Sequence, residues 1–343
     1  MKQHFFFGCI ILLLLLFMPL IGLSGQLKQA FVSQPAQAPP VTGQPAQKLA
    51  PTESKKAGED NPEVISVMRS GSGQTEVMPM DEYLLGVLAA EMPANSHEEA
   101  LKAQAVASYT YARYRTEVAG VKALSDSGRV EQEYISKEER QRRWGDQFDI
   151  CENKLRDVVA AVRGEVVTYD SQPIFAAFHA VSHGKTESAA NYWGGTDHPY
   201  LQAAESPGDR LAPDYSKTVH FTADEMKEAL ERAAREKGYA FALDDGPASW
   251  FGKPVRSESG MVQEIEAGGQ TLAGRALREI LGLRSADFTV DFIENSFAVT
   301  TRGYGHGVGM SQYGADFMAR QGSDYKEILG HYYQGTEISY PMK

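Results

Sequence analysis

An almost unbroken apolar run at residues 5–23 constrains this chain most, because such a segment cannot lie on the surface of a water-soluble domain. At about 1.5 Å per residue, a helix over this run can cross a hydrocarbon layer of roughly 30 Å. The alternative is a cleaved signal peptide, but Gly-Leu-Ser-Gly at residues 22–25 fits the small-residue ending of a signal peptide poorly. Lys2 precedes the run and little charge follows it directly. We therefore expect an uncleaved, single-pass transmembrane helix at residues 1–24, with the rest of the chain on the outer face of the cell membrane.

Residues 25–60 have the composition of a tether. Gln-Pro-Ala-Gln occurs at residues 34–37 and again at residues 44–47, and Pro, Gln, Ala and Ser dominate the segment. Such a sequence cannot bury enough apolar surface to offset the entropy lost on ordering. We therefore expect a disordered Pro/Gln/Ala-rich linker, followed by one folded domain at residues 61–343.

The composition of the whole chain is that of a globular protein. Of its 343 residues, 42% are hydrophobic and 23% are charged, and the net charge is −11. This negative surplus leaves no basic excess to neutralise phosphates, so nucleic acid is not an expected partner. The chain has two cysteines, of which Cys9 falls in the apolar run. Cys151 is then the single thiol of the folded part, which excludes an internal disulfide and a cysteine-rich zinc site there.

Strand-like and helix-like patterns mix after residue 61 and show no repeat. The strands expected lie at residues 64–68, 75–78, 165–169, 174–181, 287–294 and 297–301, the first two as a hairpin. The helices expected lie at residues 79–92, 97–118, 149–163, 222–238, 311–320 and 325–333. Because the strands do not alternate regularly with the helices, the fold class is α+β, with mixed helices and short β-sheets.

Glu91 is the first candidate for catalysis, because it ends one face of an otherwise apolar helix. Leu84, Val87 and Leu88 share that face at spacings of three and four residues. Apolar neighbours and the negative end of the helix dipole both disfavour the carboxylate anion, so we expect a raised pKa for Glu91. A carboxyl group that stays protonated near neutral pH is what a general acid requires. The competing interpretation is a solvated glutamate at a frayed helix end.

Lys102 and Gln104 lie early in the helix that follows. The short link between the two helices keeps the start of this second helix near Glu91, and its alanines allow close packing. A lysine in this position can orient a sugar hydroxyl or a bound anion. The alternative for Lys102 is an exposed side chain on an amphipathic helix.

A second group of candidates follows the strand expected at residues 174–181. It combines polar and aromatic side chains: Ser182, His183, Lys185, Thr186, Tyr192 and Trp193. Aromatic faces beside polar donors suit sugar rings, which have apolar C–H faces and hydroxyl edges. Ser182 and His183 do not form a catalytic pair, since sequence neighbours on a strand point in opposite directions. The structural alternative is a polar loop covered by an aromatic side chain.

The third group lies in the glycine-rich segment at residues 303–314. Its candidates are Tyr304, His306, Ser311, Gln312 and Tyr313. The glycines permit positive φ angles and close backbone approach, and Ser311 is placed to open the next helix. The segment lacks the Gly-Lys-Ser/Thr ending of a phosphate-binding loop, so a nucleotide is not the expected ligand. No acidic pair accompanies the histidines, so we expect neither a metal nor another cofactor.

Three segments together resemble the stage II sporulation protein D family. They read Ala-Ala-Glu-Met-Pro at residues 89–93, Ala-Leu-Lys-Ala-Gln-Ala-Val-Ala at residues 100–107, and Gly-His-Gly-Val-Gly-Met-Ser-Gln-Tyr-Gly-Ala at residues 305–315. The resemblance covers roughly residue 64 to the C-terminus and implies a membrane-tethered peptidoglycan lytic transglycosylase of engulfment during sporulation. It implies that Glu91 is the catalytic glutamate and that Lys102 is the helix lysine of the family.

This chain departs from the family sequence at one place, and the resemblance also implies binding partners. Family members read Ala-Arg-Thr where this chain has Ser-Tyr-Thr at residues 108–110, so Tyr109 replaces an active-site arginine, and Arg113 is a candidate to supply its role. The implied partners are peptidoglycan glycan strands, a sporulation amidase (stage II sporulation protein P) and a membrane scaffold (stage II sporulation protein M).

Two other functions stay open at this point. A non-catalytic, peptidoglycan-binding amidase activator would need the aromatic residues but not Glu91. A glycan hydrolase would need a second carboxylate, for which Glu187 and Asp197 are the nearest candidates.

Overall fold

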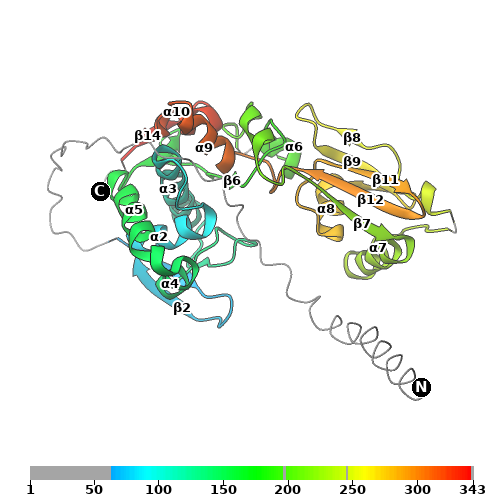
Figure 1. Cartoon of the computed structure of the whole chain (residues 1–343), viewed down its shortest axis with the longest axis horizontal. Helices are drawn as coiled ribbons and strands as arrows, with labels where there is room; N and C mark the ends of the chain where they lie inside the picture. Colours follow the sequence, from blue (N-terminus) through cyan, green and yellow to red (C-terminus); the bar gives the residue numbers. More distant parts are fainter. Residues whose placement is uncertain (1–62, 196–197, 245, 341–343) are drawn as a thin grey trace, which may run out of the picture. The chain divides into compact units, whose positions relative to one another are not determined.

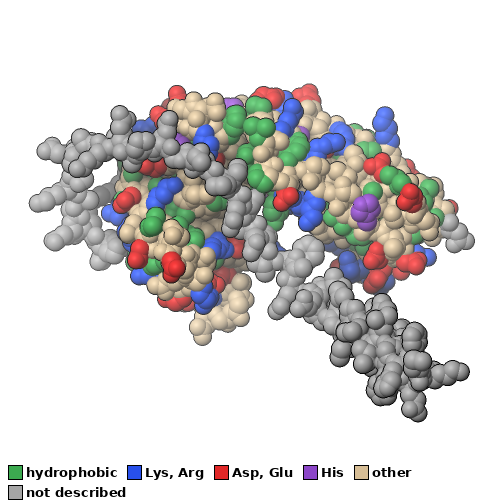
Figure 2. Space-filling view, in the orientation of Figure 1, with side chains coloured by type: hydrophobic (Ala, Val, Ile, Leu, Met, Phe, Trp, Pro, Cys, Tyr) green, Lys and Arg blue, Asp and Glu red, His purple; other side chains and the backbone are tan. Residues whose placement is uncertain are grey.

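The computed structural model describes residues 63–195, 198–244 and 246–340. These residues form a mixed α+β fold with several short sheets, which confirms the fold class expected from the sequence (Figure 1). The transmembrane helix expected at residues 1–24 and the linker expected at residues 25–60 lie outside the described residues. Within the described ranges, no helix has both the length and the apolar character needed to cross a membrane. Basic and acidic side chains are interspersed over the face that Figure 2 shows.

A first hydrophobic core surrounds helix α3 (Glu98–Arg113). The alanines of α3 are buried, and their small side chains let other helices approach closely. The helices packed on α3 are α2 (Met80–Glu91), α5 (Phe148–Ala161), α9 (Gln312–Arg320) and α10 (Tyr325–Tyr332). Because α2 and α9 come from opposite ends of the described chain, this core brings the predicted catalytic glutamate and the glycine-rich segment together.

Short sheets border the first core. Their strands are β1 (Val64–Met68), β2 (Thr75–Pro79), β3 (Leu124–Ser125), β4 (Val166–Tyr169), β5 (Gln172–Pro173), β6 (Phe178–His179), β13 (Met310–Ser311) and β14 (Glu337–Ser339). β1 and β2 form the predicted hairpin, and β3 pairs parallel with β1. β4 lies between β5 and β14. β6 pairs parallel with β13, which fixes the end of the glycine-rich segment beside His179.

A second hydrophobic core is built from the chain between β6 and β13. Its elements are β7 (Ser216–Thr222), α7 (Ala223–Lys237), β8 (Val255–Arg256), β9 (Val262–Ala267), β10 (Gln270–Ala273), α8 (Gly274–Leu281), β11 (Phe288–Ile293) and β12 (Ser296–Arg302). β12 lies between β11 and β7 in an antiparallel sheet, as Figure 1 shows, and β9 lies between β10 and β8. Helix α7 begins at a capping box in which Thr222 and Glu225 each accept a hydrogen bond from the other's backbone N–H. It ends at Gly238, whose left-handed φ of 76° terminates the helix.

Two predicted elements differ from the structure. The strand expected at residues 174–181 is wrong apart from β6, because the N–H of Ala177 bonds to the carbonyl of Phe175 and turns the chain sharply. The helix expected at residues 97–118 is α3 followed by a π-helical turn, Tyr114–Val118.

Ser-His-Glu-Glu at residues 96–99 has the pattern of a capping box with Ser96 as the cap, but the structure differs. His97 caps α3 instead, through its ring nitrogen, which accepts from the N–H of Glu99. Helix α4 (Lys137–Trp144) is absent from the prediction because Lys-Glu-Glu-Arg-Gln-Arg-Arg-Trp has no apolar face. Its position is set instead by the buried Arg140, which forms ion pairs with carboxylates of α2 and α5.

Candidate active site

Glu91 is the last residue of α2, and its carboxyl group is held from two sides. Oε1 accepts a hydrogen bond of 2.8 Å from the backbone N–H of Glu133, and Oε2 accepts one of 3.3 Å from the side-chain amide of Gln312. Burial raises the pKa of Glu91 to about 7, although both donors favour the anion and act in the opposite direction. The residue as a whole is only half-buried, so it keeps access to solvent. A carboxyl group with this pKa can release and recover a proton near neutral pH.

Gln312 connects Glu91 to the interior of the first core. Its Nε2 lies 3.4 Å from Oε1 of Gln104, whose own amide donates to the hydroxyl of Ser108 at 3.0 Å. Gln104, Ser108 and Gln312 are all buried. This chain of hydrogen bonds restricts the orientation of the Glu91 carboxyl group on the side that faces the core. The structure therefore brings two of the predicted site residues, Gln104 and Gln312, together with Glu91.

The loop that supplies the Glu133 N–H was not predicted to belong to the site. Gln132 is buried and anchors this loop by donating to the Tyr83 hydroxyl at 3.0 Å and to the Ser108 carbonyl at 3.1 Å. This anchor positions the N–H of the next residue against Glu91. The side chain of Glu133 is exposed, and its negative charge raises the pKa of Glu91 further.

The start of α9, and with it Gln312, is fixed by a buried carboxylate at Asp209. The hydroxyl of Ser311 accepts from the N–H of Gly314 and donates to Oδ1 of Asp209 at 2.8 Å. The second oxygen of Asp209 accepts from the backbone N–H of Ser182 at 2.8 Å. Burial raises the pKa of Asp209 to about 6. The predicted residues Ser182 and Ser311 thus support the site indirectly, through a carboxylate that the sequence did not indicate.

Lys102 lies on α3 but makes its polar contacts away from Glu91. Its ammonium group forms ion pairs of 2.8 Å with Glu98 and with Glu99, both on the same helix. Within the described residues it makes no hydrogen bond or ion pair to Glu91. The structure therefore explains Lys102 as part of an intrahelical charge network.

Tyr109 and Arg113 also contact other groups than Glu91. The Tyr109 hydroxyl donates to the Glu63 carboxylate and accepts from the Arg113 guanidinium, each at 2.8 Å. Burial is the main reason that the pKa of Tyr109 rises to about 12. Neither side chain bonds to Glu91 in the part of the chain that the structure describes.

Tyr192 and Trp193 end the short helix α6 (Ala189–Trp193) and pack beside His306. The Trp193 and His306 ring centroids are 5.2 Å apart, and Tyr192 meets Trp193 edge-on at 5.6 Å. Arg278 of α8 donates to the Tyr192 hydroxyl at 2.8 Å, so the second core contributes a contact to this aromatic group. The three predicted residues form one cluster, which has no hydrogen bond to Glu91 among the described residues.

His306 is held by backbone groups on both sides of its ring. Nδ1 accepts from the N–H of Val308 at 3.0 Å, and the ring also bonds to the backbone of Phe178. Burial and the nearby charge of Arg278 lower the pKa of His306 to about 4, so the imidazole is neutral at physiological pH. His306 therefore offers a ligand the face of its ring rather than a free nitrogen. Across the residues described, no group of three or more His, Cys, Asp or Glu side chains is arranged to hold a metal ion.

The remaining predicted residues contact other parts of the chain. The pairs are Thr186 with the Ala204 backbone, Lys185 with Glu205, Tyr304 with Arg284 and Tyr313 with the Leu211 carbonyl. His183 bonds through Nε2 to the carbonyl of Ser259, which lies in the loop between β8 and β9. These contacts give the residues a structural role in joining segments, and none of them reaches Glu91.

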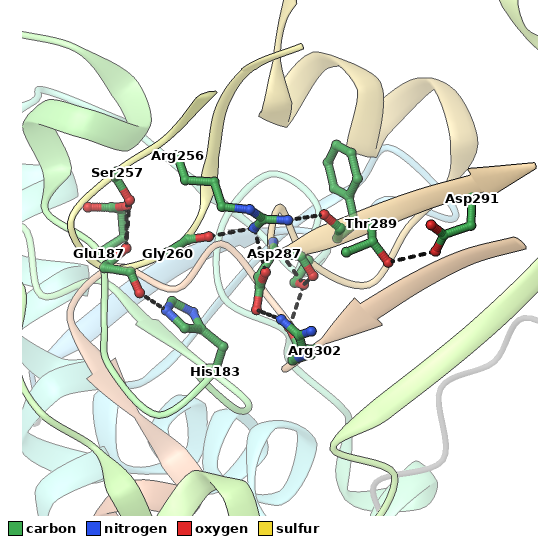
Figure 3. Close-up of polar contacts among 12 residues, drawn as sticks. His183, Glu187, Arg256, Ser257, Gly260, Asp287, Thr289, Asp291 and Arg302 are labelled. Carbon is green, nitrogen blue, oxygen red and sulfur yellow. Dashed lines mark hydrogen bonds and ion pairs between the residues drawn. The ribbon is translucent and has the colours of Figure 1, made fainter. Parts of the chain in front are cut away.

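Glu187, the nearest candidate for a second carboxylate, is buried and carries donors on both oxygens. The donors are the Ser188 N–H, the Asn191 amide and the hydroxyl groups of Ser257 and Ser259. Figure 3 shows this carboxylate beside Ser257, away from the separate Arg256–Asp287–Arg302 ion-pair cluster. Glu187 therefore ties the two cores together and does not pair with Glu91. Asp197, the other candidate, lies outside the described residues.

Part of this site lies in a segment that matches a known protein family. A family described as "Stage II sporulation protein" matches residues 68–169, which include Glu91, Gln104 and the loop of Glu133. The chain is 41% identical to the stage II sporulation protein D of Bacillus subtilis, over 91% of this chain and 88% of that protein. It is 36% identical to the protein of the same name in Bacillus amyloliquefaciens, over 87% of each. An amidase enhancer of Bacillus subtilis is more distant, at 26% identity over 75% of this chain and 40% of that protein. The resemblance seen in the three sequence segments is thus confirmed, and the chain belongs to the stage II sporulation protein D family.

Proposed function

We propose that this protein is a lytic transglycosylase that cuts the glycan strands of peptidoglycan during sporulation and leaves 1,6-anhydromuramic acid ends. The observation that carries the proposal is the Glu91 carboxyl group, whose pKa is about 7 and whose two oxygens are held by separate donors. A group that is partly protonated at neutral pH suits a cycle in which one side chain acts first as an acid and then as a base.

The proposed reaction needs one carboxyl group and no water. Protonated Glu91 gives its proton to the glycosidic oxygen as the bond from that oxygen to the anomeric carbon breaks. The resulting carboxylate takes the proton of the muramic acid 6-hydroxyl as this oxygen attacks the same anomeric carbon. Glu91 ends the cycle protonated again, ready for another strand. Glycoside hydrolysis ordinarily uses two carboxyl groups, and the bonding of Glu187 to four donors makes it unsuitable as the second.

Other parts of the proposal rest on the sequence. The apolar run at residues 5–23 is proposed to anchor the enzyme in the cell membrane, with the linker carrying the domain to the cell-wall side. Membership of the family supports a role in engulfment with stage II sporulation protein P, an amidase, and stage II sporulation protein M, a membrane scaffold.

Gln104 and Gln312 are proposed to orient Glu91 through the hydrogen bonds that connect the three side chains.

Mass spectrometry of purified glycan strands after incubation with the full-length protein tests the proposal. Fragments with anhydro ends are expected, while fragments with reducing ends would identify a hydrolase. Intact strands would favour the second candidate function, a binding protein that activates an amidase. The similarity to an amidase enhancer is the observation that supports this second candidate.

A further inference from the structure

A pocket of about 550 Å³ lies beside the aromatic cluster and away from the contacts of Glu91. Its walls include Phe175, Trp193 and His198, with Pro199 and Gln202 at the exposed rim. The volume is in the range of pockets that hold a small ligand, roughly 300–1,000 Å³. The mechanism proposed for Glu91 makes no use of this pocket.

The walls of the pocket suit the face of a sugar ring. Phe175 meets Trp193 edge-on at 5.7 Å and stacks on His198 at 5.2 Å, so the rings form a continuous, half-buried aromatic surface. Such a surface packs well against C–H groups, and the Gln202 amide at the rim can bond to hydroxyl or acetamido groups. This chemistry favours the ring of an N-acetylated sugar.

Helix α3 relates the wall of the pocket to the contacts of Glu91. Gln104, which contacts Gln312 at the Glu91 end, lies seven residues before Tyr111, whose ring packs on Phe175 at 5.5 Å. Seven residues of α-helix extend about 10 Å. The Phe175 wall of the pocket is therefore displaced by about two helical turns along α3 from the contacts of Glu91, which is longer than one sugar residue.

The parallel pairing of β6 with β13 gives a second relation, between the backbones of Phe175 and Gln312. Phe178 lies opposite Met310, so Phe175 and Gln312 are five residues apart along the paired strands. Five fully extended residues span about 16 Å, and the turn at Ala177 shortens this distance. Both separations are longer than one sugar residue, which fits a subsite beyond those next to the scissile bond.

We infer that this pocket is a remote subsite that binds an N-acetylhexosamine of the same glycan strand that Glu91 cuts. This inference rests on the proposed function, because it assigns the pocket to the same substrate. A strand that fills both places binds more tightly than one too short to reach the pocket. The enzyme therefore discriminates between glycan strands by length, through KM rather than kcat.

Two variants of the full-length protein test the subsite. Trp193→Ala removes an aromatic wall. Ala190→Glu introduces a charge and bulk at an exposed lining position in the first turn of a helix, where an acidic residue is well tolerated. Tyr239→Ala, which truncates a half-buried aromatic residue of the second core, is the matched control. Thermal unfolding identifies any variant that fails to fold, and Ala190→Glu leaves the packing of Trp193 in place.

The first readout is calorimetric binding of neutral N-acetylglucosamine oligomers, which requires no cleavage and so does not depend on the proposed reaction. We expect Trp193→Ala and Ala190→Glu each to weaken binding about 3- to 10-fold, and Tyr239→Ala to leave it unchanged. Failure of the wild type to bind, or equal binding by all variants, would overturn the subsite even if the enzyme cuts glycan.

The second readout is kinetics on glycan strands of defined length. We expect both variants to raise KM for long strands by a similar factor and to leave kcat and the shortest cleavable strands unaffected. An equal loss on short and long strands would contradict a remote subsite. A wild type that binds the oligomers but cuts no glycan would refute the proposed function and leave the binding pocket standing.

Discussion

Replacing Glu91 by Gln should change the pH dependence of stability as well as activity. Burial raises the pKa of this carboxyl group from its ordinary 4.5 to about 7, so the folded state binds its proton more tightly than the unfolded state does. The contribution of Glu91 to stability is therefore fully present below about pH 4.5 and is lost as the pH rises through 7. The variant has no such proton, so its stability relative to the wild type should increase over the same interval.

The size of this effect follows from the difference between the two pKa values. At 1.36 kcal/mol per pH unit, the difference corresponds to at most about 3 kcal/mol. Because Glu91 is partly exposed, solvent reduces this to about 1–2 kcal/mol, which corresponds to a few degrees in melting temperature. Thermal unfolding of the wild type and Glu91→Gln at pH 4.5, 6, 7 and 8 measures it, with Glu228→Gln on the exposed surface of α7 as the control. A melting-temperature difference that stays constant across these pH values would refute the reasoning.

Three further variants test other parts of the account. Deleting residues 26–59 should leave the melting temperature unchanged, because their composition offers no core to lose, and a large fall would show that the segment packs on the domain. His306→Ala should lower the free energy of unfolding by about 2 kcal/mol or more, since it leaves backbone groups of Val308 and Phe178 without partners. Denaturant unfolding measures this loss, and a clearly smaller loss would contradict the role of these bonds. Asp209→Asn cannot accept from both Ser311 and Ser182 through its amide, so it should cost about 1–3 kcal/mol and reduce glycan cleavage; full activity would show that the start of α9 needs no such support.

The part of the site that could be predicted from the sequence is the part with a local pattern. Spacings of three and four residues place Glu91 at the end of an apolar helix face, and the glycine-rich segment singles out Gln312. The Glu133 N–H could not be predicted in this way, because its loop has no periodicity and is positioned by the distant Tyr83 and the backbone of Ser108.

Lys102 and Asp209 show two other limits of prediction from sequence. The ion pairs of Lys102 with Glu98 and Glu99 have the three- and four-residue spacings of a helix surface, so the sequence already contained the signal for them. Asp209 gives no such signal, since its partners Ser182 and Ser311 are far from it along the chain and meet only in the folded core.

The central claim is that Glu91 carries the proton in glycan cleavage, and the most direct test is the product analysis of Glu91→Gln. The variant keeps the size of the side chain but can neither donate the acid proton nor become the base. General acid–base groups contribute about 10²- to 10⁴-fold, so release of anhydro-ended fragments should fall at least that far while binding to intact strands persists. Mass spectrometry that finds anhydro-ended fragments released by Glu91→Gln at a near wild-type rate would contradict the assignment.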